Sequence, residues 1–248
     1  MGKKRKKRRS IKNKLLAILA FVSLSAAGWL VVVNVFTVEE VKVEGSVYNP
    51  EEDIRDWLLN DEYCGNSLYV YLKYKFVEPE EMPFVDTAEV FLKPPHRLTI
   101  KVKEKDLMGR IYISATGQNA YFDGNGIVVE MSSDEKQGVP NIKGMDVDKI
   151  VLGKKLPIKG DSVLKHLLTL TDLLAKYEQV PGSVKYNKEG GFTLKYGKVS
   201  VQIGTALHLD EKVVRLSRIL PLLDGKKGTL HLEGWTEHTT DITFEESG

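Results

Sequence analysis

The longest apolar run in the chain covers residues 15–36, 22 residues without an ionisable side chain. At about 1.5 Å per helical residue this run would be roughly 33 Å long, and the hydrocarbon core of a bilayer is about 30 Å thick. The pattern therefore predicts a transmembrane helix at residues 15–36.

Shorter apolar periods follow between residues 37 and 105. A valine-rich, partly alternating stretch at residues 38–43 predicts a strand, and alternation at residues 85–92 and 98–104 predicts two more. A helix is expected after Asn49, its predicted cap, with Pro50 at its first position and with Ile54, Trp57 and Leu58 on its buried face.

A second helix is expected after Ser67, its predicted cap, and is closed by Pro79 and Pro83. Its predicted buried face carries Leu68, Tyr71, Leu72 and Phe76. The element order in this segment is therefore β-α-α-β-β.

Residues 106–244 show short strands at close spacing, interrupted by two helical patterns. Helices are predicted from residue 161 or 162 to about 175 and from 210 to 223, the second disturbed near its end by Pro221. The first helix is expected to bury Leu164, Leu167, Leu168, Thr171, Leu174 and Ala175. Residues 143–160 are expected to form a loop, and the predicted strands are 110–113, 121–122, 127–129, 140–142, 183–186, 192–196, 199–203, 229–233 and 241–244.

Together these patterns predict an α+β protein with a single N-terminal transmembrane helix. The expected segments are a basic tail at 1–14, the span at 15–36, a small domain at 37–105, a larger β-rich domain with two helices at 106–244 and a short tail at 245–248.

The charge distribution gives the span an orientation. Nine basic residues precede residue 15, while the part after residue 36 holds 27 basic and 34 acidic residues, a net charge of −7. Basic flanks remain in the cytoplasm, so we expect a cytoplasmic N-terminus and extracellular C-terminal domains. A nucleic-acid-binding arm is the weaker interpretation of the basic tail.

A cleaved signal peptide is an alternative to the retained span, because Ser25, Ala26 and Ala27 are small. The apolar core of a signal peptide has about 7–15 residues. Here the apolar run continues beyond these small residues to Val33. This continuity favours a retained helix.

The sequence offers no recognisable catalytic or metal-binding motif. Its five histidines are scattered, no phosphate-binding or nucleotide-binding loop is present, and the glycines Gly124 and Gly126 lie in a predicted hairpin turn. Cys64 is the only cysteine and is expected to be a small, half-buried apolar residue. We therefore expect no cofactor, no metal, no small-molecule substrate and no enzymatic activity.

Several motifs, taken together with their order along the chain, resemble those of the cell-division proteins of the FtsQ/DivIB family. Residues 36–45 (FTVEEVKVEG) and 95–105 (PHRLTIKVKEK) are similar to the first and last strands of that family's POTRA domain. Residues 123–128 (DGNGIV), 140–144 (PNIKG), 201–204 (VQIG), the Glu211-Lys212 pair and residues 228–232 (GTLHL) resemble its β domain. The chain departs from the pattern at Val139, where leucine is usual, and at His231, where an acidic residue is frequent.

The resemblance implies a non-enzymatic membrane scaffold at the division septum. Such proteins hold two single-span coiled-coil proteins, of the FtsB/DivIC and FtsL types, and influence septal peptidoglycan synthesis. In the family the partner pairs near the last strands, which here implies a partner-binding site at Thr229, Leu230, His231, Leu232, Glu233 and Trp235.

In that site we expect Leu230 and Leu232 to face the core, and Trp235 to be an aromatic anchor for the partner. The alternative is that residues 241–244 cover this strand, so that it is not a free edge. Two other functions stay open, a membrane-anchored or secreted cell-envelope enzyme and a POTRA-bearing export factor.

Overall fold

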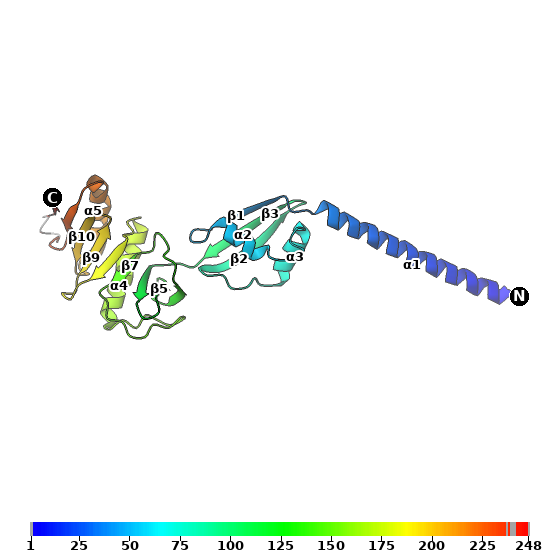
Figure 1. Cartoon of the computed structure of the whole chain (residues 1–248), viewed down its shortest axis with the longest axis horizontal. Helices are drawn as coiled ribbons and strands as arrows, with labels where there is room; N and C mark the ends of the chain where they lie inside the picture. The colour runs from blue at the N-terminus through cyan, green and yellow to red at the C-terminus, as the bar shows by residue number, and fades with distance from the viewer. Residues whose placement is uncertain (1, 237, 239–241, 248) are drawn as a thin grey trace. The chain divides into compact units, whose positions relative to one another are not determined.

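The computed structural model describes residues 2–236, 238 and 242–247, with side chains from Asn13 onward except that of Asp161. Within these residues the chain is an α+β protein with five α-helices and twelve strands, as predicted for the fold class. It divides into two compact units, Met1–Glu104 and Lys105–Gly248 (Figure 1). Three predicted segments extend beyond these residues: Met1 of the basic tail, Asp241 of the last predicted strand and Gly248 of the short C-terminal tail lie outside the described part.

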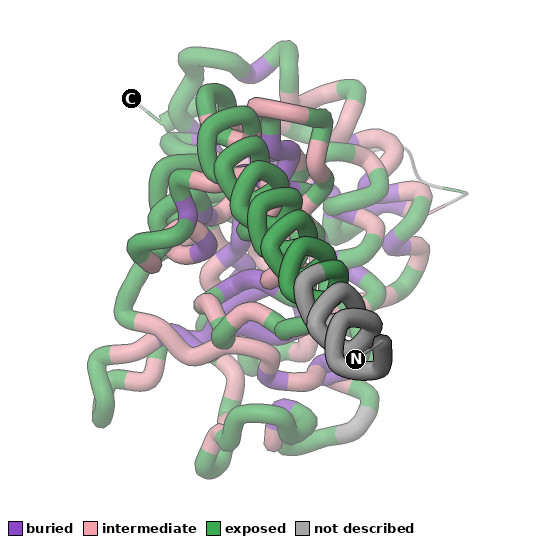
Figure 2. Tube along the Cα trace, turned by 90° about the vertical axis from the view of Figure 1, so that its right-hand side faces the viewer, coloured by how far each residue is buried: buried purple, intermediate pink, exposed green. Residues whose placement is uncertain are grey.

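The first unit begins with α1 (Gly2–Val35). Its apolar part, Asn13–Val35, has 23 residues, a mean hydropathy of 2.4 and no buried residue. Figure 2 shows that the part of this helix from Asn13 onward is exposed along nearly its whole length. The chain thus has one N-terminal helix that is long and apolar enough to cross a membrane.

A three-stranded sheet follows in the order β1-β3-β2, formed by β1 (Glu40–Glu44), β3 (Arg97–Glu104) and β2 (Val85–Lys93). β1 is parallel to β3, and β2 is antiparallel to it. Two helices, α2 (Glu51–Leu58) and α3 (Ser67–Phe76), pack on it, so the predicted β-α-α-β-β order is confirmed. Its main core cluster comprises Val43, Ile54, Leu58, Val85, Ile100 and Val102.

The predicted cap of α2 is wrong. Pro50 occupies the N-cap position, and the Asn49 side chain instead donates to the Pro83 carbonyl and to the Glu104 carboxylate. That carboxylate also accepts the backbone N–H groups of residues 47–49, at 2.6–3.0 Å. Glu104 therefore fixes the loop that leads into α2. The sequence around Asn49 gives no sign of this role, because Glu104 is distant in the chain.

The predicted start and buried face of α3 are also wrong. Asn66, not Ser67, is the cap, because its side-chain oxygen accepts the Tyr69 N–H. Val70 is fully buried, whereas Leu72 and Phe76 are exposed. The helix is apolar on several sides, so its periodicity did not identify the side that packs on the sheet.

The second unit is built on a nine-stranded sheet in the order β12-β11-β10-β9-β8-β7-β4-β5-β6. Its strands are β4 (Gly109–Ile113), β5 (Gln118–Phe122), β6 (Val128–Ser132), β7 (Asn141–Lys143), β8 (Ser183–Tyr186), β9 (Phe192–Tyr196), β10 (Val199–Gly204), β11 (Gly228–His231) and β12 (Thr243–Glu246). The pairs β4–β7, β7–β8 and β10–β11 are parallel, and the others are antiparallel. Glu245 and Glu246, predicted as tail, belong to β12.

Two helices pack on this sheet, α4 (Asp161–Lys176) and α5 (Leu209–Ile219). α5 continues into the short 3-10 helix η1 (Leu220–Leu223), as expected from Pro221. The expected α4 face is mostly correct, but Ala175 is exposed and Leu170 is buried in its place. One core cluster joins the two helices to the strands, and it includes Leu167, Leu170, Leu174, Val184, Leu194, Val201, Val213, Leu216, Leu230 and Leu232.

Candidate functional site

The predicted partner-binding residues lie at one end of the nine-stranded sheet, around β11. β11 is parallel to β10 on one side and antiparallel to β12 on the other, with His231 opposite Thr243 and Gly228 opposite Glu246. The structure therefore has the alternative arrangement, in which the last segment of the chain pairs with this strand and covers it. β11 is not an edge, and among the described strands the edge at this end of the sheet is β12.

The side chains of β11 alternate between the core and the surface. Leu230 is 1% exposed and Leu232, just after the strand, is fully buried, so the prediction that both face the core is confirmed. Thr229 and His231 are half-buried, and Glu233 is exposed. The surface above β11 thus consists of one hydroxyl, one imidazole and one carboxylate.

His231 lies between two carboxylates. Its Nδ1 is 2.8 Å from Oε1 of Glu233, and its Nε2 is 3.6 Å from Oε2 of Glu245 on β12. The hydrogen bond with Glu233 is the main reason that the pKa of His231 is raised above its ordinary value, and Glu245 adds to it. When the imidazole is protonated, its contact with Glu245 helps to hold β12 against β11.

Trp235, the predicted aromatic anchor, is only 3% exposed. The guanidinium carbon of Arg215 on α5 lies 3.8 Å from the centre of its ring, and the His208 ring contacts it edge-on at 5.8 Å. A partner on this surface would therefore meet the residues that cover Trp235, not its indole.

The sequence did not predict a buried lysine beside this site. Lys212 of α5 is 1% exposed, and its Nζ donates to the Ile203 carbonyl of β10 at 2.9 Å. Burial lowers the pKa of Lys212, while the Glu233 carboxylate opposes that shift. This hydrogen bond ties α5 to the strand that supports β11.

The hydrogen-bonding direction of β12 follows from its register. Ser247 N donates to Lys227 O at 2.9 Å, which continues the β11–β12 ladder by one pair. Because hydrogen-bonded and non-hydrogen-bonded pairs alternate in antiparallel strands, Thr243 and Glu245 also bond to β11. The backbone N–H and C=O groups of Phe244 and Glu246 therefore point away from β11, toward the open side of the sheet.

Gly228 permits the close approach of β12. A Cβ atom at this position would overlap the Glu245 carbonyl oxygen and lie 2.7 Å from the Phe244 ring. Its φ is not in the left-handed region, so the requirement for glycine is one of space alone. Gly228 opens the GTLHL motif, which is the only sequence signal that could have indicated it.

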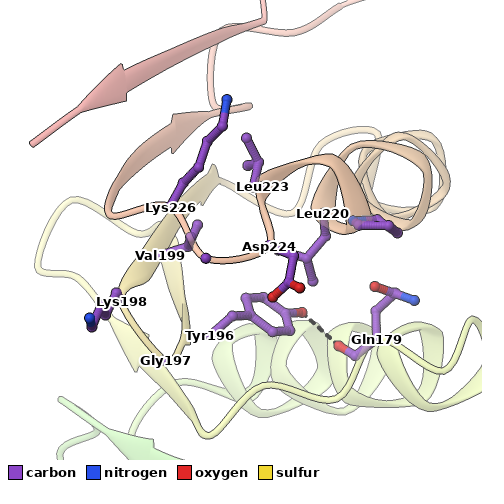
Figure 3. A pocket seen from close by; sticks show the side chains of 11 residues that line it. Gln179, Tyr196, Gly197, Lys198, Val199, Leu220, Leu223, Asp224 and Lys226 are labelled. Carbon is purple, nitrogen blue, oxygen red and sulfur yellow. Dashed lines mark hydrogen bonds between the residues drawn. The ribbon is translucent and has the colours of Figure 1, made fainter.

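A hollow of about 650 Å³ lies next to the start of β11, between the β9–β10 turn, the end of α4 and η1 (Figure 3). Tyr196 and Asp224 project toward it, and the Tyr196 hydroxyl donates to the Gln179 carbonyl at 2.6 Å. Burial raises the pKa of Tyr196, so this hydroxyl stays protonated at neutral pH. The hollow offers polar contacts but no activated nucleophile.

The described residues contain neither a metal-binding cluster nor a reactive thiol. Among these residues no group of three or more His, Cys, Asp or Glu side chains is placed to hold a metal ion. Cys64 packs against Val70 and Leu98, is 7% exposed, and has its pKa raised by burial. Its thiol is thus a packing group and a poor nucleophile at neutral pH.

Comparison of the chain with protein-family models gives no match. A search of curated proteins likewise finds no match. The likeness to the FtsQ/DivIB family therefore rests on the residues quoted above and remains an interpretation of them.

Proposed function

We propose that this chain is a non-enzymatic, single-pass membrane scaffold of the bacterial division machinery, of the FtsQ/DivIB type. In this proposal α1 crosses the cell membrane with its N-terminus in the cytoplasm. Both folded units then lie outside the cell, enriched at the septum, where they hold coiled-coil proteins of the FtsB/DivIC and FtsL types. Through these partners the complex influences septal peptidoglycan synthesis.

The N-terminal helix supports the membrane part of this proposal. Asn13–Val35 is apolar and unburied, so outside a membrane it would expose an apolar surface along 23 residues. The nine basic residues before residue 15 favour cytoplasmic retention of that end.

The open edge at β12 carries the scaffold part of the proposal. An edge strand presents unpaired N–H and C=O groups, and a partner segment completes them by adding a further strand. On β12 these groups belong to Phe244 and Glu246. The family resemblance implies that the partner binds near the last strands of the domain. The open edge, β12, is the strand next to β11, which contains the binding residues inferred from the sequence.

The side chains around this edge set the chemistry of a matching partner. Glu245 and Glu246 are exposed carboxylates, and Glu233 adds a third near β11. A partner strand with basic side chains at the facing positions would complement them. Half-buried Phe244 offers an apolar contact at the centre of β12.

Binding by the full-length chain in lipid nanodiscs tests the proposal. It is titrated with exterior segments of the host's FtsB/DivIC-type and FtsL-type proteins, singly and together. The decisive variant is Glu246→Pro, because proline removes an outward N–H that β11 does not use, a place where strands tolerate proline. Loss of this hydrogen bond and the added ring should weaken binding by ~10–100-fold.

Glu246→Ala is the matched control, because it removes the same carboxylate but keeps the N–H. We expect Glu246→Ala to change binding much less than Glu246→Pro, with both variants unfolding at the parent temperature. Equal binding by the parent and Glu246→Pro would place the partner elsewhere. No binding of either segment by the parent would reject the scaffold function and return the envelope-enzyme alternative to first place.

A further inference from the structure

The exposed side of α3 departs from the usual composition of a surface helix. Leu72 is 42% exposed and Phe76 is 78% exposed, and Tyr69 lies on the same side at a spacing of three and seven residues. Tyr63, from the preceding loop, is exposed and contacts Tyr69 with ring centres 5.5 Å apart. We call Tyr63, Tyr69, Leu72 and Phe76 the aromatic face.

The neighbouring helix shows the contrast. The exposed positions of α2 are charged: Glu51, Glu52, Asp53, Arg55 and Asp56. α3 has no acidic residue and carries two lysines, Lys73 and Lys75. α3 is therefore apolar both toward the sheet, where Val70 is buried, and on its outer side, as expected of a helix with a second apolar environment.

Hydrogen bonds fix the start of α3 to the end of the apolar helix. Asn66 caps α3 through its oxygen, and its side-chain nitrogen donates to the Val32 carbonyl of α1 at 2.8 Å. Ser67 N also donates to the Phe36 carbonyl at 2.8 Å. One asparagine thus satisfies a free N–H of α3 and gives a second hydrogen bond to a carbonyl of α1 that also accepts the Phe36 N–H.

This connection sets the depth of α3 if α1 crosses a membrane. Val32 lies three residues before the last residue of α1, which corresponds to about 4.5 Å along the helix. The first turn of α3 therefore begins at the height where the apolar span ends, and Figure 1 shows α3 at the end of this unit where α1 joins.

We propose that the aromatic face of α3 rests in the lipid headgroup region of the membrane that α1 crosses. This inference rests on the membrane part of the proposed function. Tyrosines occupy the boundary between headgroups and acyl chains, and an interfacial helix inserts its apolar side by about 5–10 Å. Lysine side chains extend from such a face toward lipid phosphates.

Of the two lysines, Lys75 fits this environment. Lys75 Nζ lies 5.9 Å from the Phe76 ring centre, and Lys73 Nζ forms an ion pair with Asp61 at 2.8 Å. An anionic bilayer surface would attract Lys75, whereas the charge of Lys73 is already balanced by Asp61. Docking of α3 would restrict the angle between the first unit and the membrane, which a single span followed by a free linker would leave open.

Quenching of tryptophan fluorescence by nitroxide-labelled lipids tests the proposal on the full-length chain in anionic nanodiscs. The probe is Leu72→Trp. The matched control is Val47→Trp, because Val47 is 78% exposed but lies beyond the far end of β1, about 20 Å from the end of the span. Both probe chains carry Trp29→Phe, and the chain with Trp29→Phe alone gives the background of Trp57 and Trp235.

We expect headgroup-level nitroxides to quench Leu72→Trp several-fold more than Val47→Trp. Equal, weak quenching of the two probes would overturn lipid docking. Weak quenching of Leu72→Trp in lipid that decreases further when the coiled-coil segments are added would indicate that the aromatic face binds a protein. That result would also overturn lipid docking.

The native Trp29, inside the apolar run, separates this result from the membrane proposal. Strong quenching of Trp29 by nitroxides on the acyl chains, with no quenching of Leu72→Trp, would keep the span and reject only the docking of α3. Absence of Trp29 quenching would reject the span and the docking together.

Discussion

A methyl group added at Gly228 tests how β12 is held. Gly228→Ala would drive a Cβ into the Glu245 carbonyl and to 2.7 Å from the Phe244 ring. Carbon atoms in favourable contact lie about 3.5–4.0 Å apart, so β12 has to move by about 1 Å. The backbone of Gly228 itself accepts alanine, because its φ lies outside the left-handed region.

The size of the effect follows from what holds β12. It pairs with β11 over four residues and half-buries Phe244. With about 1 kcal/mol net per backbone hydrogen bond and part of an aromatic side chain's burial, the local free energy of opening should fall by about 2–4 kcal/mol. At 1.4 kcal/mol per tenfold, amide exchange should then accelerate by a factor of about 30 to several hundred.

Residue-resolved hydrogen exchange measures this opening. Thr229 and His231 direct their N–H groups to β12, so their exchange should accelerate, while Leu230, which faces β10, should remain protected. Gly234→Ala is the control, because a Cβ there meets no atom of the described residues within 4 Å. Unchanged protection of Thr229 and His231 in Gly228→Ala would refute the close approach of β12 at Gly228.

Two further predictions concern stability and protonation. Glu104→Gln should destabilise the first unit by about 2 kcal/mol and lower its melting temperature by roughly 8–16 °C, because both carboxylate oxygens accept N–H groups of residues 47–49 and an amide nitrogen cannot. Exposed Glu89→Gln serves as control, and equal melting of the two variants would contradict the role of Glu104. The raised pKa of His231 means that its contribution to stability is present below about pH 6.5 and is lost as pH rises through the raised value. NMR titration should show a lower pKa for His231 in Glu233→Gln, and an unchanged value would contradict the hydrogen bond as its main cause.

The sequence predicted most elements of the fold because their patterns are local. The strands at residues 183–186, 192–196 and 199–203 alternate over short runs bounded by glycine, and all three are where they were expected. Pro221 ends α5 and produces η1 for a purely local reason, its missing N–H and fixed φ.

The features that escaped prediction depend on contacts between distant segments. Asn49 cannot be distinguished from a helix cap without the Glu104 carboxylate, which follows 55 residues later. The buried side of α3 was misjudged because the helix is apolar on more than one side. For Lys212, sequence reasoning had no means to expect a buried ammonium bonded to the Ile203 carbonyl.

The candidate site was located only in part. Residues 229–233 were predicted as a strand, which the structure has at Gly228–His231, and the predicted burial of Leu230 and Leu232 was correct. Which strand forms the edge depends on the pairing of β12 with β11, and alternation within either strand does not reveal it. Trp235 was expected at the surface because aromatic residues frequently bind partners, but Arg215 and His208 cover it.

Amide exchange of the complex tests the central claim most directly. The full-length chain in nanodiscs is compared with and without the FtsB/DivIC-type and FtsL-type segments, at residue resolution over β12. We predict that the N–H groups of Phe244 and Glu246, which donate to no described residue in the unbound chain, become protected on binding, while the N–H of Glu245 is protected in both states. Binding that leaves Phe244 and Glu246 unprotected would contradict strand addition at β12, and protection confined to another surface would move the site there.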